Sequence, residues 1–197
     1  MPSQINLFDG DADAGPQSIE GMPEGFRYIP SVVSPAEENA ILEDIRGLPF
    51  RDFEFHGYTG KRRVVSFGWQ YDFAAEQVRQ ADDIPGFLLA IRPRAAALAG
   101  LDPESLHQVL VTEYGPGAGI GWHRDKAVFG AVVGISLLAS CVFRLRRRTG
   151  ETWSRLKLVA EPRSGYVLDG AARWVWEHSI PPVAALRYSI TFRHLRG

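Results

Sequence analysis

The sequence predicts a mainly β protein of the α+β class, built as a double-sheet jelly roll (double-stranded β-helix) with supporting N-terminal helices. From Val109 onward, short apolar runs are separated by Gly and Pro, a pattern typical of a sandwich or barrel with many short strands. A chain of 197 residues with 45% apolar content can form one domain with a sizeable core. A jelly roll would also bring together candidate metal ligands that lie far apart in the sequence.

Two helices are expected ahead of the strand-rich region. Ser34 to Glu37 reads as a capping box with proline at the first helical position, which would satisfy free amide groups at a helix start. Apolar residues follow at helical spacing, and Gly47 is a suitable terminator. A second helix is expected between Pro85 and Gly100, where Pro93 should bend or divide it.

The rest of the chain is assigned by its composition. Residues 1–24 are rich in Asp, Gly, Pro and Ser, which predicts a flexible arm ahead of one domain over residues 25–197. The expected strands are Val109–Tyr114, Val132–Leu138, Cys141–Leu145, Leu156–Val159, Tyr166–Leu168, Arg173–Trp176 and Tyr188–Phe192.

Charge and cysteine content exclude several classes of protein. The formal net charge is −1, from 22 basic and 23 acidic side chains, so nucleic acid could be bound only through a local patch. The run Arg144–Arg148 could be such a patch, or equally a solvated strand edge whose charges prevent edge-to-edge pairing. A single cysteine, Cys141, permits no intrachain disulfide and favours the core and a reducing compartment. With no apolar stretch long enough for a bilayer, we expect a cytoplasmic monomer without membrane contact.

The most informative segment runs from Tyr114 to Asp125 and ends in an H-x-D pair, His123 and Asp125. Side chains two residues apart on an extended segment point to the same side, so both could bind one metal ion. His178 is the third candidate ligand. Two histidines and one carboxylate suit non-haem Fe(II) with open coordination positions.

An H-x-D pair alone is common by chance, but the C-terminal part adds a second signal. Arg187 and Arg193 lie on the same face of an expected strand. The planar guanidinium group can hold a carboxylate through two hydrogen bonds. This pattern indicates a co-substrate that carries carboxylates.

Taken in order, these residues resemble the AlkB family of Fe(II)/2-oxoglutarate dioxygenases. The resemblance extends from about Arg62 to Arg193. It rests on the segment 62–71, the Tyr-Gly-Pro-Gly at Tyr114, the H-x-D pair, Arg173 ahead of His178, and the terminal R-x5-R. It implies a double-stranded β-helix that uses Fe(II), 2-oxoglutarate and O2. It further implies oxidative demethylation of alkylated DNA or RNA bases with release of formaldehyde, on a substrate that we expect to be single-stranded.

The resemblance also implies roles for individual residues. His123, Asp125 and His178 would be the catalytic metal ligands. Tyr114 and Arg187 would bind the distal carboxylate of 2-oxoglutarate, and Arg193 would lie beside its iron-chelating end. The expected co-substrate set also includes Ser189 and Thr112, which replaces an asparagine found in many members.

Substrate contacts are expected before and after the H-x-D pair. In the resembled family the segment at Phe67–Tyr71 forms a lid over the nucleotide, so Trp69 and Tyr71 could stack on an extruded base; equally, they could pack against the helices. The expected basic contacts are Arg62, Arg63 and Lys126, while Trp122, Trp174 and Trp176 are expected to wall the metal site.

Lys126 keeps other functions open, because demethylases of the family often carry an acidic residue just after the metal-binding aspartate. The first alternative is a 2-oxoglutarate-dependent hydroxylase or demethylase of a protein or small molecule. The second is a non-catalytic nucleic-acid-binding module, against which the complete ligand set and both arginines argue.

Overall fold

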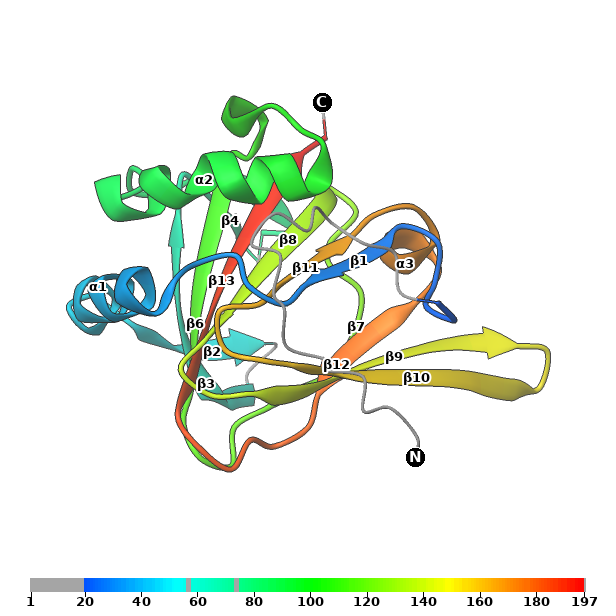
Figure 1. Cartoon of the computed structure of the whole chain (residues 1–197). Coiled ribbons are helices and arrows are strands. Elements are labelled where there is room, and N and C mark those ends of the chain that lie inside the picture. The colour runs from blue at the N-terminus through cyan, green and yellow to red at the C-terminus, as the bar shows by residue number, and fades with distance from the viewer. Residues whose placement is uncertain (1–19, 56–57, 73–74, 197) are drawn as a thin grey trace, which may run out of the picture.

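The computed structural model describes residues 20–55, 58–72 and 75–196, and within them the strands form two main antiparallel sheets (Figure 1). The large sheet has seven strands, which in spatial order are β1 (Phe26–Ile29), β11 (Gly165–Leu168), β8 (Phe129–Leu137), β13 (Arg187–Leu195), β6 (Gln108–Tyr114), β3 (Tyr58–Phe67) and β2 (Arg51–Phe55). The small sheet has four, in the order β10 (Thr152–Ala160), β9 (Cys141–Thr149), β12 (Glu177–Ile180) and β7 (Ile120–His123). A separate hairpin consists of β4 (Trp69–Asp72) and β5 (Gln77–Gln80).

Two helices, α1 (Pro35–Arg46) and α2 (Gly86–Ala99), cover one face of the large sheet (Figure 1). Side chains in a strand alternate between faces, so every second residue of the central strands points toward these helices. The resulting core includes Ile45 and Leu88 from the helices and Val111 and Ile190 from the sheet. Burying this face against helices leaves the opposite face available for a site.

A second core lies between the two sheets. Phe26 and Leu168 of the large sheet pack with Phe143 and Leu145 of the small one, and Cys141 is among the buried residues of this cluster. Two antiparallel sheets that pack in this way form the predicted jelly roll, which the structure confirms.

The predicted helix ends are also observed. The Ser34 hydroxyl accepts from the Glu37 amide at 3.2 Å, and the Glu37 carboxylate accepts from the Ser34 amide at 2.7 Å. Gly100 ends α2 in the left-handed conformation, with φ of +69°, which glycine adopts at little cost. The helix continues through Pro93 without division. A short 3-10 turn, η1 (Pro103–Ser105), follows.

The strand expected at Arg173–Trp176 is wrong. Residues Gly170–Trp174 form a short helix, α3, which Asp169 caps by accepting from the Gly170 amide at 2.8 Å. The next strand, β12, begins only at Glu177. Apolar and aromatic composition indicated a strand there. The Asp169 cap and the burial of Arg173, which is 2% exposed, instead favour a helix.

Part of the predicted N-terminal arm, residues 1–19, lies outside the described residues. At its end, the Glu24 carboxylate accepts from the Ala171 amide at 3.1 Å. The division into arm and domain stays a prediction. Among the helices of the described segments, none combines the length and apolar character needed to cross a membrane.

Candidate metal and co-substrate site

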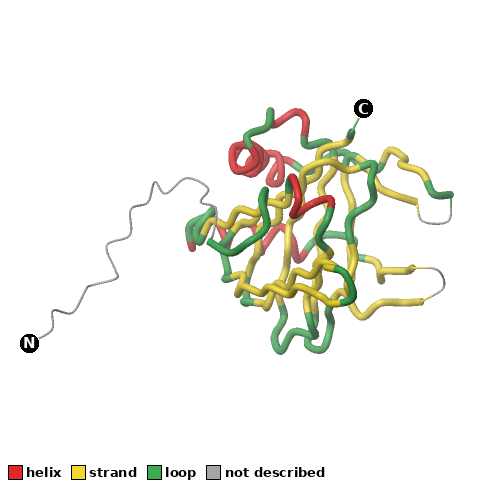
Figure 2. Tube along the Cα trace, turned by 90° about the vertical axis from the view of Figure 1, so that its right-hand side faces the viewer, coloured by secondary structure: helices red, strands yellow, loops and turns green. Residues whose placement is uncertain are grey.

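A cavity of about 1120 Å³ opens between the two sheets. Its wall includes residues of the large sheet, such as Thr112 and Ser189, and residues of the small sheet, such as His123 and His178. Residues of the β2–β3 and β4–β5 hairpins complete the lining. Figure 2 shows these two hairpins, each with a grey tip, projecting on the same side of the molecule. The two projecting hairpins therefore form part of the wall of the cavity.

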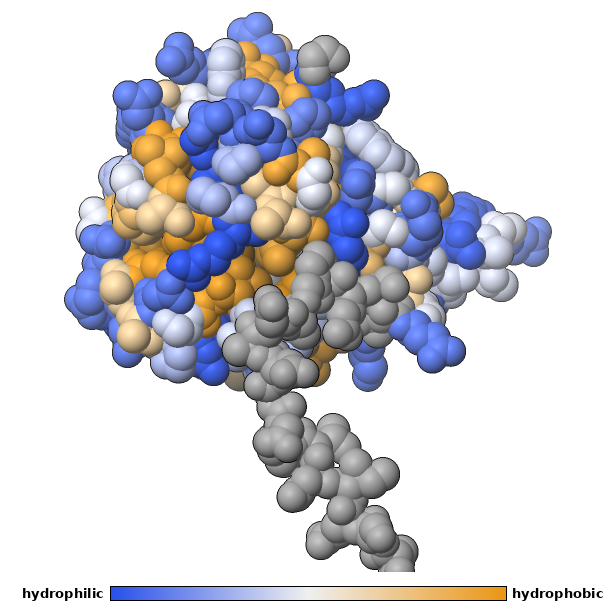
Figure 3. Space-filling view, turned by 45° about the horizontal axis from the view of Figure 1, so that its top comes forward, coloured by the Kyte–Doolittle hydropathy of each residue, from blue (hydrophilic) through white to orange (hydrophobic). Residues whose placement is uncertain are grey.

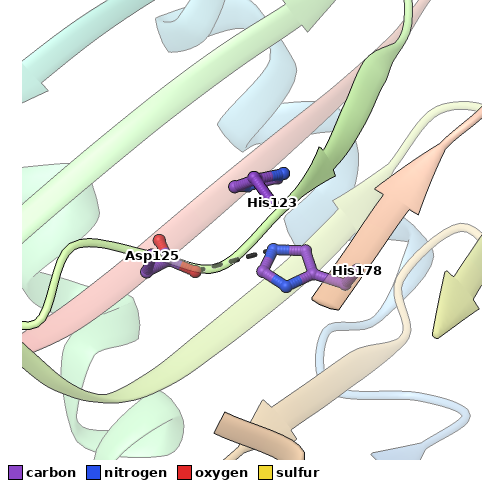
Figure 4. Close-up of side chains that lie close together, drawn as sticks. All are labelled: His123, Asp125 and His178. Carbon is purple, nitrogen blue, oxygen red and sulfur yellow. Dashed lines mark ion pairs between the residues drawn. The ribbon is translucent and has the colours of Figure 1, made fainter. Parts of the chain in front are cut away.

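The three candidate metal ligands meet in this cavity (Figure 4). His123 ends β7 and is paired in register with His178 on β12, with ring centroids 4.2 Å apart. Asp125 lies two residues beyond the end of β7, so the pair does not share one extended segment as expected. Its carboxylate nevertheless turns to the same side, and one ligand atom from each residue lies within 4.8 Å of the others.

Both imidazoles are in the form that binds metal. His123 Nδ1 lies 2.9 Å from the carbonyl oxygen of Gly121, a contact that fixes the ring and leaves Nε2 to face the cavity. Burial lowers the pKa of His123, and burial followed by the neighbouring His123 lowers the pKa of His178 to about 3. Both rings are therefore neutral near pH 7.

Asp125 is held as a carboxylate. Burial raises its pKa, but Arg193, His178 and His123 outweigh burial and hold the pKa well below its usual range. Arg193 donates from Nε to Oδ1 of Asp125 at 2.7 Å, and its Nη2 lies at 2.7 Å from the same oxygen. The other oxygen, Oδ2, lies 3.5 Å from His178 Nε2. Arg193 thus occupies one oxygen and leaves the second for a metal ion.

Arg187 provides a second, independent sign of an anion-binding site. Its side chain is 1% exposed, and Nη2 donates to Ser136 Oγ at 2.9 Å. Nε and Nη1 are buried without a hydrogen-bond partner among the described residues. Leaving charged donors buried and unpaired costs free energy, and an anionic co-substrate could supply acceptors for them, with a carboxylate binding end-on through Nη1 and Nη2.

The wall between Arg187 and the metal ligands carries hydroxyl groups. On β13 the alternation puts Arg187, Ser189 and Arg193 on one face, and the latter two line the cavity. In register with them on β6 are Tyr114, opposite Arg187, and Thr112, opposite Ser189. The Arg187 guanidinium carbon lies 4.8 Å from the Tyr114 ring centroid. The sequence-predicted co-substrate residues therefore lie together on one surface.

The predicted substrate contacts divide into two groups. Arg62, Tyr71 and Lys126 line the cavity, and Lys126 Nζ lies 4.9 Å from the Tyr71 ring centroid. Arg63 and Trp69 are not among the lining residues, so their expected contact with a substrate in the cavity is corrected. Arg63 follows Arg62 on β3 and therefore points to the opposite face, where it pairs with Glu113 at 2.6 Å.

Other tryptophans also differ from the expectation. Trp122, Trp174 and Trp176 do not line the cavity. Trp176 packs in the core with 5% exposure, and Trp174 is 37% exposed at the surface. Trp122 is the direct neighbour of His123 on β7 and therefore faces the other way. Trp174 lies in α3, and Trp176 precedes β12, so neither shares a strand with His178.

Arg173 has a structural role that its sequence position did not show. Its guanidinium donates to the carbonyl oxygens of Gly130 at 2.8 Å, Lys126 at 2.9 Å and Phe129 at 2.7 Å. These bonds fix the segment that directly follows Asp125. The only signal in the sequence was the position of this arginine, five residues before His178.

The family model of the 2OG-Fe(II) oxygenase superfamily matches residues 25–193. The chain belongs to this superfamily. As a superfamily member it is a dioxygenase that uses Fe(II), 2-oxoglutarate and O2, and the donor set and the unpaired Arg187 fit these groups.

The relatives place the oxygenase among AlkB-like members. It is 28% identical over 181 residues to the Arabidopsis thaliana alkylated DNA repair protein ALKBH8 homolog, covering 80% of this chain and 51% of that protein. It is 25% identical over 170 residues to the Mus musculus tRNA (carboxymethyluridine(34)-5-O)-methyltransferase ALKBH8, covering 83% of this chain and 25% of that protein. The oxygenase thus spans about half or less of the length of these relatives.

A solved structure shows the same fold. OsALKBH1 superimposes with a TM-score of 0.65 at 17% identity, over 91% of this chain and 99% of that one. At this level of identity the likeness concerns the fold of the oxygenase and not its substrate.

Proposed function

We propose that this dioxygenase demethylates N-alkylated bases of DNA or RNA by oxidation. One observation carries the proposal: an aromatic ring and two cations, Tyr71, Lys126 and Arg62, line the same cavity as the metal and co-substrate residues. An extruded base could stack on the ring while the cations contact phosphate. The names of the relatives, a DNA repair protein and a tRNA-modifying enzyme, agree with this substrate class.

Each residue of the site has a defined task in this proposal. His123, Asp125 and His178 would hold Fe(II), which when bound supplies O2 activation coupled to decarboxylation of 2-oxoglutarate to succinate and CO2. Arg187 and Tyr114 would bind the distal carboxylate. Arg193 holds Asp125 in place through Oδ1, so that Oδ2 stays directed at the metal.

The remaining residues would orient reactants and exclude water. The hydroxyls of Thr112 and Ser189 would hydrogen-bond the co-substrate from the cavity wall. Tyr71 would hold the base so that its N-methyl carbon lies close to the metal. One oxygen atom inserted into a C–H bond of that methyl group gives a hydroxymethyl group, whose C–N bond then breaks to release formaldehyde.

An alternative function keeps Fe(II) and 2-oxoglutarate but has a protein or a small molecule as its substrate. Lys126 stands where nucleic-acid demethylases of this type often carry an acidic residue, and it lines the cavity. A cation at this place would also suit an acidic peptide or metabolite. A peptide product heavier by one oxygen atom would favour this alternative. The hypothesis of a non-catalytic module is set aside, since the chain belongs to an oxygenase superfamily.

The test is succinate release in the presence of different substrates. With Fe(II), ascorbate and 2-oxoglutarate, an N-methylated oligonucleotide should raise succinate release above the level seen with the unmethylated oligonucleotide. The Asp125→Ala variant should release none. Stimulation by peptides but by no methylated oligonucleotide would contradict the proposed substrate class.

We also propose a single-stranded substrate and a monomeric, cytoplasmic enzyme. Comparing the same modified strand with and without its complement tests strandedness. Light scattering tests the oligomeric state, and cell fractionation tests the location.

A further inference from the structure

The outer face of the small sheet carries five basic side chains. Phe143 and Leu145 of β9 are buried between the sheets, so the alternate residues of β9 point outward. We call the outward set the basic face; it consists of Arg144, Arg146 and Arg148 on β9 and Arg155 and Lys157 on β10. Figure 1 shows the β9–β10 hairpin projecting from the body, and the projection is mostly hydrophilic in Figure 3.

The register of this hairpin brings like charges together. Arg146 lies directly opposite Arg155, and Arg144 lies directly opposite Lys157. Like charges in directly opposite positions destabilise a strand pair. Within the described part of the chain, Glu177 is the only carboxylate that forms an ion pair with this face, with Arg146 at 2.6 Å. Four of the five cations therefore lack a counter-ion among the residues that the structure describes.

Protection of a sheet edge does not explain these charges. Charged side chains often prevent edge-to-edge pairing, and β10 is indeed an edge strand. The three arginines, however, lie on β9, an interior strand between β10 and β12. Arginines on an interior strand that lie opposite other cations cost stability and protect no edge, which points to an anionic partner.

Two indole rings hold the central arginines in place. The guanidinium carbon of Arg146 lies 4.5 Å from the Trp122 ring centroid and 4.2 Å from that of Trp153. The guanidinium carbon of Arg144 lies 4.9 Å from the Trp122 ring centroid, and its Nε donates to Ser179 Oγ at 3.0 Å. Arginines fixed in this way lose little further freedom when they bind a ligand.

We infer that the basic face binds the sugar-phosphate backbone of a nucleic acid. Guanidinium groups bind phosphate through paired hydrogen bonds, and half-buried indoles beside them could stack on bases. The net charge of −1 requires binding through such a local patch. Strand β7 connects the two surfaces, because its Trp122 lies on the basic face while Gly121 and His123 line the cavity. The ligand class rests on the proposed function, and the basic face adds a contact outside the reaction cavity.

The test is binding of an unmethylated, fluorescein-labelled single strand of about 16 nucleotides to the full-length protein, followed by fluorescence anisotropy. The test variant is the double substitution Arg155→Gln, Lys157→Gln, which removes two exposed cations. The control variant, Arg147→Gln with Arg46→Gln, removes the same charge. Arg147 lies on the inner side of β9, over Trp176, and Arg46 lies on α1.

The test variant should bind roughly tenfold more weakly than the control variant at about 50 mM salt. Its plot of log affinity against log salt should be shallower by about 1.4, or about 0.7 for each lost phosphate contact to a single strand. Equal affinity and equal salt slope in the two variants would overturn the inference.

Activity assays separate this inference from the proposed function. Both variants should demethylate a free methylated nucleoside at the wild-type rate, since neither changes a residue of the cavity. If the test variant binds and demethylates oligonucleotides like the wild type, the basic face is not a nucleic-acid site, while the proposed function stands. If the wild type binds no oligonucleotide and yields no formaldehyde, both ideas are refuted.

Discussion

Replacing Arg187 by methionine should abolish co-substrate binding and leave the ligand-free protein at least as stable as the wild type. In the free protein, two buried N–H groups of Arg187 have no partner among the described residues. A carboxylate bound end-on to Nη1 and Nη2 accepts two hydrogen bonds, and at about 1.5–3 kcal/mol each for a charged group these amount to about 3–6 kcal/mol. This corresponds to a loss of roughly 10²- to 10⁴-fold in 2-oxoglutarate affinity.

The free energy of unfolding of the ligand-free Arg187→Met variant should rise or stay unchanged, although its affinity for 2-oxoglutarate falls. Methionine has a similar length and no charge, and replacing buried ionic groups by apolar residues of similar volume is often neutral or stabilising by about 1–4 kcal/mol. The hydrogen bond to Ser136 Oγ is lost, which reduces this gain by about 1 kcal/mol.

Thermal unfolding with Mn²⁺ in place of iron measures both effects. For the wild type, 2-oxoglutarate at about 100 times its Kd adds about 2.7 kcal/mol, which raises Tm by about 5–11 °C for a chain of this size. At the same concentration the variant should gain at most about 0.4 kcal/mol, or less than about 2 °C. A wild-type shift in the variant would refute the assignment of Arg187 to the co-substrate, and a large loss of ligand-free stability would show that the arginine is structural.

Three further predictions concern other parts of the site. In the metal-free protein the pKa of His178 is about 3 against its ordinary 6.5. Between these two pH values the unfolded chain binds more protons than the folded protein. The free energy of unfolding should therefore fall by about 1.4 kcal/mol for each pH unit below pH 6.5. Urea unfolding at several pH values measures this slope, which should be smaller in His178→Gln; an equal slope would contradict the burial of a neutral ring. Arg173→Gln should lower the free energy of unfolding by about 3 kcal/mol or more, because three carbonyl oxygens lose their donor. The same variant should bind a metal ion more weakly in a titration. Unchanged metal affinity would show that Arg173 does not position Asp125. Tyr71→Ala should raise the KM for a methylated oligonucleotide by about 5- to 150-fold, since stacking contributes about 1–3 kcal/mol. Tyr71→Phe keeps the ring and should keep the KM, so equal KM values in both variants would exclude stacking.

Much of the fold could be predicted because its signals are local. The capping box at Ser34 and the left-handed glycine at Gly100 are set by backbone chemistry within a few residues. The apolar run of β8 is buried along its whole length and those of β6 and β13 over most of theirs, as their composition indicated. Local rules failed at Gly170–Trp174, where tertiary burial of an arginine outweighed the strand-like composition.

The site was only partly predictable, because it depends on register and on the direction of each side chain. The H-x-D spacing put His123 and Asp125 on one side, but only the pairing of β7 with β12 shows that His178 lies opposite His123. Arg63 could not be separated from Arg62 in the sequence, since a shift of one residue reverses the face. Arg187 was named for its spacing, whereas its unpaired buried donors are visible only in three dimensions.

The most direct measurement of the proposed activity uses a base that carries a trideuterated N-methyl group in a synthetic oligonucleotide. Oxidative demethylation replaces one C–D bond and leaves two, so the released formaldehyde should be dideuterated and equal in amount to the demethylated base. The Asp125→Ala variant should release none. Succinate formed without dideuterated formaldehyde, across methylated DNA and RNA alike, would contradict a nucleic-acid demethylase.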